Sequence, residues 1–327
     1  MAPFIANRQI YLNFDKCYKY GVVNNCVQRT EDFNLNCPAH EEADTKIVYH
    51  ICKINFEANI TIRCSDTDVA IIMLANMENT HKDVNISMEF GVGNHQRFIN
   101  ITKLYKNLGP QLSAALPGFH ALTGCDFNPA FFRKGKNRTF QLLQKTQKYI
   151  DAFKKISNIS EIDINKEFST IEEYVCRIYG FTKMNEINKA RVASFVKTYK
   201  ILDNDDVFQL PKKSIDGSAM PPCQSELRQH FLRTCYIAHL WAHAFCKNPS
   251  PFFPENYGWE EKEEKYIFKW FEGTQLPSQV SEITLDSTED NTEENDENQL
   301  DTSETLPSSD EEDSGQSNND STDSEDE

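Results

Sequence analysis

The last 47 residues limit what the rest of this 327-residue chain can fold into. Residues 281–327 contain 19 Asp and Glu side chains, no Lys or Arg, and almost no apolar side chains. Burial in such a segment cannot offset the entropy of ordering it, so we expect it to be disordered. The chain has a formal net charge of −16, which leaves about +3 on residues 1–280. The part that can fold is therefore close to neutral and would not repel a polyanion.

The sequence also predicts the compartment. No run approaches the roughly 20 apolar residues that span a bilayer, and the first residues lack the basic and apolar regions of a signal peptide. Ten cysteines are scattered without a C-x-x-C pair, which favours free thiols in a reducing compartment. We therefore expect an intracellular protein, nuclear or cytoplasmic, with no membrane partner.

The first 140 residues show two kinds of pattern. Residues 1–37 alternate aromatic and polar side chains, with breaks at Gly21 and Asn24-Asn25, and predict a lead-in hairpin or remnant strands. From residue 38 to residue 140, helical spacing that begins near Glu41 alternates with short β-branched runs. The predicted strands cover residues 60–64, 84–90 and 97–101. This alternation is typical of an α/β core with a mostly parallel sheet, covered by helices on both faces.

The second half of the chain has a different pattern. After a helical stretch over 112–122 that Pro117-Gly118 should interrupt, the pattern becomes helical throughout. The predicted helices cover residues 140–156, 170–179, 186–199 and 224–245. We therefore expect a helical extension over 141–275 and a disordered acidic tail over 276–327.

Five carboxylates stand where a sheet-and-helix fold would bring them together: at a helix start, after a strand, and near the end of the sheet region. They are Glu42, Asp44, Asp66, Asp68 and Asp126. Oxygen ligands of this kind suit Mg²⁺ or Mn²⁺, and two such ions about 4 Å apart can activate water and hold the leaving oxygen of a phosphodiester. Taken singly, each is more typical of a capping residue, and helical spacing leaves Glu41 open as an alternative to Glu42.

These motifs resemble those of the PIN-like nucleases of the flap endonuclease, XPG and Asteroid group. Glu42-Ala43-Asp44 is similar to the acidic helix start of that group, Ser65-Asp66-Thr67-Asp68 to its Asp-x-Asp after a strand, and Thr123-Gly124-Cys125-Asp126 to its Gly-Cys-Asp motif. More narrowly, the run from Leu116 to Asp126 with Lys134-Gly135-Lys136 resembles a class of uncharacterised animal proteins associated with mobile elements. The resemblance implies a PIN-like three-layer core over 38–140 and the five carboxylates as catalytic metal ligands.

One part of the nuclease pattern is missing from this sequence. The nuclease fold begins with a strand bearing an Asp, and a second N-terminal carboxylate follows, but only Asp15, Glu31 and Asp32 precede Glu41 here. Loss of two ligands normally removes activity from a two-ion site. Two functions therefore stay open. One is a structure-specific endonuclease or exonuclease, completed by a longer gene product or a partner chain; the other is a non-catalytic nucleic-acid- or protein-binding module derived from such an enzyme.

A basic segment follows Asp126 closely. Its four cations are Arg133, Lys134, Lys136 and Arg138. The resemblance places them where the nucleases hold a phosphate backbone, so we expect nucleic-acid binding with little sequence preference and strong salt dependence. The acidic tail is expected to lie over this patch or to bind a protein partner.

Overall fold

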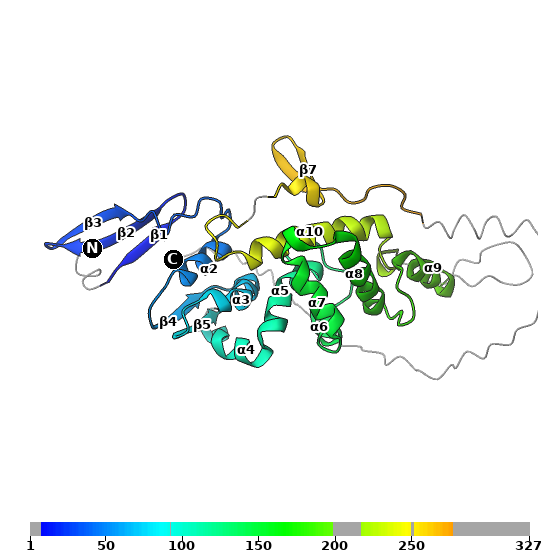
Figure 1. Cartoon of the computed structure of the whole chain (residues 1–327), viewed down its shortest axis with the longest axis horizontal. Coiled ribbons are helices and arrows are strands. Elements are labelled where there is room, and N and C mark those ends of the chain that lie inside the picture. The colour runs from blue at the N-terminus through cyan, green and yellow to red at the C-terminus, as the bar shows by residue number, and fades with distance from the viewer. Residues whose placement is uncertain (1–7, 92, 199–216, 250–251, 277–327) are drawn as a thin grey trace, which may run out of the picture.

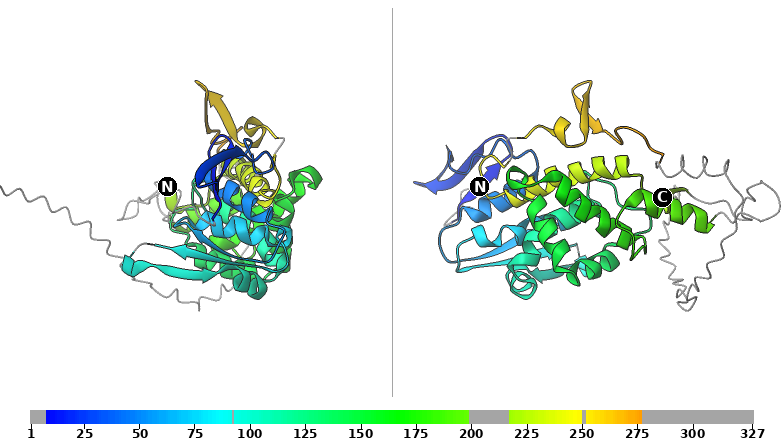
Figure 2. Two further views of the ribbon diagram at one scale, coloured as in Figure 1. Left: turned by 90° about the vertical axis from the view of Figure 1, so that its left-hand side faces the viewer. Right: turned by 45° about the vertical axis from the view of Figure 1, so that its right-hand side comes forward.

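The computed structural model describes residues 8–91, 93–198, 217–249 and 252–276, and its architecture is mixed α/β. Apart from residue 276, the predicted acidic tail lies outside the described residues. Figure 1 shows a small N-terminal sheet at one end of the molecule, a second sheet with helices packed beside it, and α9 at the other end. The right-hand view in Figure 2 shows the same order.

The N-terminal sheet is an antiparallel meander, as the alternating pattern predicts. Its strands are β1 (Ile10–Asn13), β2 (Cys17–Val23) and β3 (Cys26–Glu31). Asn24 and Asn25 form the turn with φ angles of 48° and 59°, the left-handed conformation that a two-residue hairpin needs. Gly21, which we expected to break a strand, instead lies within β2 and pairs with Gln28. Extended backbone is open to any residue, so glycine alone does not end the strand.

The central sheet is mixed rather than mostly parallel. Its strands are β4 (Ala58–Arg63), β5 (Val84–Phe90) and β6 (Arg97–Asn100), in that order. β4 and β5 are parallel, because α3 (Thr67–Ala75) supplies the crossover between them. β5 and β6 are antiparallel, because a parallel return needs a connection of about a dozen residues and only residues 91–96 separate them.

We predicted helices on both faces of this sheet, but the exposure of its residues indicates that only one face is covered. Along β5, Val84, Ile86 and Met88 are buried, whereas Asn85 between them is exposed. β4 alternates in the same way, with Thr61 facing solvent. Alternation of this kind belongs to a sheet with one covered face and one open face.

Helix α5 (Pro110–Leu122) runs through the middle of the molecule without the predicted interruption. Pro117 lies inside the helix, and its neighbour Gly118 packs against α7 (Gln147–Ile156). A β-carbon at Gly118 would lie 2.9 Å from Ile156 Cδ1 and 3.0 Å from the carbonyl oxygen of Phe153. The Pro-Gly pair therefore permits a close helix crossing rather than a break.

Two of the remaining helices precede α5 in the chain and four follow it. They are α2 (Ala43–Cys52), α4 (Ile101–Leu108), α6 (Lys136–Gln144), α8 (Ile164–Ile178), α9 (Ile187–Thr198) and α10 (Gln224–Ala242). The single helix predicted over 140–156 is two helices, α6 and α7, which meet at Lys145 and Thr146. One hydrophobic cluster contains buried residues of the central sheet and of the later helices together. α10 packs on α3, α5, α7 and α8, so the two predicted regions share a core.

A last hairpin, β7 (Trp259–Lys262) and β8 (Lys265–Phe268), stands away from α10 in Figures 1 and 2. Its inner end is tied to α10, since the Arg233 guanidinium donates to the carbonyl oxygens of Gly258 and Lys269 at 3.1 and 2.9 Å. Among the described residues, none of the helices has the length and apolar content to cross a bilayer.

Candidate functional site

The site begins where β4 ends. Asp66 is the N-cap of α3, and its Oδ1 accepts a hydrogen bond from the backbone N–H of Asp68 at 2.8 Å. This is ordinary capping, as the pattern after the strand allows. It uses only one oxygen of Asp66 and turns the next acidic side chain inward, so that Asp68 is 8% exposed.

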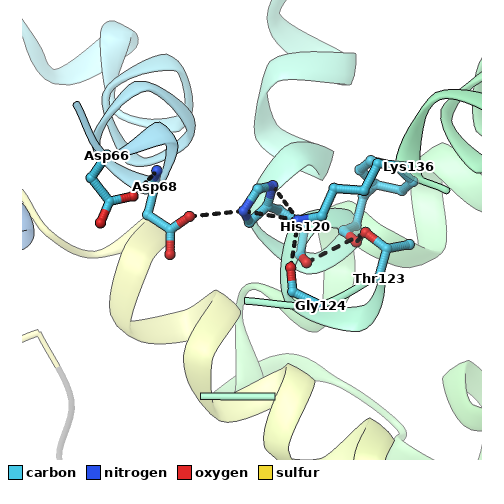
Figure 3. A network of polar contacts seen from close by, with 7 residues as sticks. Asp66, Asp68, His120, Thr123, Gly124 and Lys136 are labelled. Carbon is cyan, nitrogen blue, oxygen red and sulfur yellow. Dashed lines mark hydrogen bonds and ion pairs between the residues drawn. The ribbon is translucent and has the colours of Figure 1, made fainter. Parts of the chain in front are cut away.

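Asp68 points to a histidine on α5. Its Oδ1 lies 2.8 Å from His120 Nε2, and both side chains are largely buried (Figure 3). Because a carboxylate can only accept, we infer that Nε2 donates its proton to Asp68. The ammonium of Lys136 lies 3.0 Å from both ring nitrogens of His120. This ammonium also donates to the carbonyl oxygen of Gly124.

Sequence reasoning assigned no role to His120. It lies in the motif that carries the resemblance, six positions before Asp126, and its neighbours Phe119 and Ala121 are buried apolar residues. A single polar side chain in a buried helical segment next to an acidic motif was the available signal.

Glu42 and Asp44 lie at the start of α2 and act on the same region electrostatically. Burial, and then the charges of Asp44, Asp68 and Asp126, raise the pKa of Glu42 to about 7. Burial likewise raises the pKa of Asp44, with Asp66, Asp68 and Asp126 as the further causes. Asp66, Asp68 and Asp126 therefore lie within electrostatic range of the start of α2.

The helix start distinguishes Glu42 from Glu41. Glu42 is the N-cap of α2, makes no capping hydrogen bond with its side chain, and is partly buried. Glu41 is exposed, and its charge acts on Tyr236 in α10 and Tyr266 in β8 as well as on Glu42. Glu42 is therefore the one grouped with Asp68 and Asp126.

Asp126 is exposed, in a turn that Asn128 holds rigidly. The Asn128 amide donates to the carbonyl oxygens of Ala121 and His230 and to Thr234 Oγ1, and its Oδ1 accepts from Arg233 Nε at 3.0 Å. This buried side chain joins the end of α5 to α10. The Asp126 carboxylate thus stands on a fixed loop.

Carboxylate oxygens are the donors that Mg²⁺ and Mn²⁺ take, so the chemistry of these five residues fits such an ion. Their arrangement fits it less well. Across the part of the chain that the structure describes, no three His, Cys, Asp or Glu side chains are grouped closely enough to hold a metal ion together. Asp68 is already paired with His120, which in turn contacts the Lys136 ammonium.

The four cations predicted to bind nucleic acid separate into two pairs. Arg133 and Arg138 are exposed, and the Arg133 guanidinium lies 5.0 Å from the ring centroid of Phe132. Lys134 and Lys136 are half-buried, and burial lowers the pKa of both ammonium groups. Lys134 lies over the Tyr179 ring, whereas Lys136 reaches into the site described above.

Comparisons with protein-family models, with curated proteins and with solved structures found no match for this chain.

Proposed function

We propose that this chain binds the phosphodiester backbone of nucleic acids, through a PIN-like domain of the nuclease type. The observation that carries the proposal is the junction of opposite charges at Asp68, His120 and Lys136. It joins the acidic residues after β4 to the basic segment that begins α6. Nucleic-acid enzymes and their derivatives need both groups side by side, cations for the phosphates and carboxylates for the ion that accompanies them.

The start of α6 supports the proposal. Gly135 is the N-cap, no side chain caps the first turn, and no acidic residue lies in it. Its backbone N–H groups and the positive end of the helix dipole favour a phosphate. Arg133 and Arg138 on either side are exposed, so both guanidinium groups can reach the same backbone.

A PIN-like core is part of this proposal. The parallel unit of β4, α3 and β5 carries Asp66 and Asp68 at the carboxyl end of β4. Ligand sites of open α/β sheets gather at that end. Two features depart from the expected mostly parallel sheet with helices on both faces: β6 is antiparallel to β5, and one face of the central sheet is open.

The test is a titration of the full chain with a labelled single strand and with a duplex, at several salt concentrations. Arg133→Ala/Arg138→Ala should weaken binding to both, and the slope of log affinity against log salt for the single strand should fall by about 1.4, at about 0.7 per phosphate contact. Lys103→Ala/Lys106→Ala is the matched control, since it removes two exposed cations from α4. Equal effects of the two double variants would refute the proposal.

A second candidate function is metal-dependent hydrolysis of the bound phosphodiester. The observation that favours it is the effect of Asp44, Asp68 and Asp126 on Glu42, since negative charges within range of one another favour a divalent ion between them. The chain would be assayed for Mn²⁺ binding by calorimetry and for strand cleavage in Mg²⁺ or Mn²⁺. Asp126→Asn should abolish both, whereas Asp83→Asn, an exposed site outside the cluster, should change neither. Binding of nucleic acid without metal binding would leave the non-catalytic function.

A further inference from the structure

A cavity of about 370 Å³ opens beside the basic segment. It lies between the loop at residues 129–132, the end of α8, α9, the segment at residues 217–222, α10, and Trp270, which follows β8. Its volume is in the range of about 300–1,000 Å³ that is usual for small-molecule sites. None of the five candidate carboxylates or four candidate cations lines it.

The walls of the cavity are aromatic. Phe132 is 40% exposed and Trp270 is 50% exposed, so the rings of both are open to a ligand. Tyr179 also lines the cavity, and burial raises its pKa to about 12, so it stays a neutral phenol. Flat aromatic rings at the rim of a cavity offer stacking surfaces to another flat ring.

Two cations of the basic segment lie over aromatic rings that line the cavity. The Arg133 guanidinium lies over the Phe132 ring, and the Lys134 ammonium lies 4.5 Å from the centroid of the Tyr179 ring. A phosphate held by the segment would therefore lie next to the cavity, with its own base within reach of the rings.

We propose that the cavity takes one unpaired base of a single-stranded nucleic acid whose backbone lies along residues 133–138. The inference rests on the proposed function and adds to it a preference for single strands. Proteins that bind single strands combine a cationic path for the backbone with aromatic platforms on which bases stack. A base paired in a duplex has both faces covered and cannot enter.

Three residues with charged side chains line the cavity, Arg191, Glu226 and Arg233, and Glu226 offers a base a carboxylate. Glu226 lines the cavity, and its charge acts on Tyr179 and Arg233. Among the described residues its carboxylate oxygens accept no hydrogen bond, so they can accept from the N–H groups of a base. Arg233 is 1% exposed and uses Nε and Nη1 for Asn128, Gly258 and Lys269. Guanine presents two adjacent N–H donors on its Watson–Crick edge, which matches the Glu226 carboxylate; thymine presents one.

Binding can be read directly from tryptophan fluorescence. The chain has three tryptophans; Trp241 and Trp259 are 2% and 8% exposed, and only Trp270 is open to solvent. Oligothymidylate should quench the Trp270 emission of the full chain, and Trp270→Phe should lose the quenching but keep most of the affinity. Quenching that persists in Trp270→Phe would contradict the proposal.

Affinity provides the second measurement. Phe132→Ala/Trp270→Ala should weaken single-strand binding about 5- to 150-fold and leave duplex binding unchanged, since stacking of a base contributes this much. Phe56→Ala/Phe98→Ala is the control, because both rings are exposed and neither lines the cavity. Far-ultraviolet circular dichroism would establish that both double variants are folded.

The outcomes separate this inference from the function on which it rests. Equal weakening of single-strand and duplex binding, or no weakening of either, would overturn the base site while the Arg133/Arg138 result still supports backbone binding. No binding of any nucleic acid by the parent chain would overturn both. Replacement of one central thymine by guanine should strengthen binding, and Glu226→Gln should remove that gain; a gain that survives in Glu226→Gln would refute the role given to the carboxylate.

Discussion

Asn128 should be among the most sensitive positions in the molecule, although it touches no ligand. Its amide group bonds to Ala121, His230, Thr234 and Arg233, and its side chain is 1% exposed. Asn128→Ala removes two N–H donors, worth about 1 kcal/mol each, and the acceptor of a buried guanidinium, worth about 2 kcal/mol. We therefore expect the free energy of unfolding to fall by about 4 kcal/mol.

The assay is equilibrium urea unfolding of the full chain, followed by circular dichroism and by the fluorescence of the buried tryptophans. Asn107→Ala, at an exposed position near the end of α4, should change the free energy of unfolding by less than about 0.5 kcal/mol. Arg233→Met and the double variant complete a mutant cycle, in which we expect a coupling energy of about 2 kcal/mol. A loss below about 1 kcal/mol for Asn128→Ala would refute the account of this loop as the tie between α5 and α10.

Three further predictions concern charge and packing. The pKa of Glu42 is raised to about 7 from an ordinary value of 4.5, so the folded state binds its proton more tightly than the unfolded state does. In metal-free protein this residue should therefore lower the free energy of unfolding as pH rises from about 4.5 to 7. Glu42→Gln should flatten that part of a plot of unfolding free energy against pH, and an unchanged slope would contradict the prediction. Deletion of residues 281–327, which removes 19 negative charges, should strengthen nucleic-acid binding at low salt and matter less as salt screens the charges, whereas a gain that does not change with salt would point away from electrostatics. Gly118→Ala should lower the free energy of unfolding by about 1–3 kcal/mol, because the added β-carbon clashes with α7. Gly21→Ala is the control and should not lower it, since no atom lies within 4 Å of its added β-carbon. Equal thermal melting temperatures for the two variants would rule out the close crossing.

Local patterns predicted the elements whose cause is local. The Asn24-Asn25 turn, the strand before Asp66 and the helix from 224 follow from turn chemistry, β-branched runs and helical periodicity, all of which act within a few residues. The same patterns predicted a break at Pro117-Gly118 and a mostly parallel sheet. Both were wrong, because a close helix crossing and the short connection at residues 91–96 decided them.

The carboxylates of the candidate site could be named from the sequence, because an acidic residue after a strand or at a helix start is visible as a spacing. Their partners could not be named. His120 lies 52 positions from Asp68, and Arg233 lies 105 positions from Asn128. In the sequence each of them is a polar residue within a helical pattern, with nothing to mark what it will face.

The sequence by itself determined the chemistry available to this protein: acids after a strand, cations at a helix start, aromatic rings beside them and a tail of like charge. The tertiary structure alone decided which of these groups meet, which cations stay exposed, and where a cavity opens. The physical reason is that periodicity and capping depend on neighbours along the chain. Contacts such as those of Lys136 with His120 depend on how α5 and α6 pack, and that packing is set by burial over the whole core.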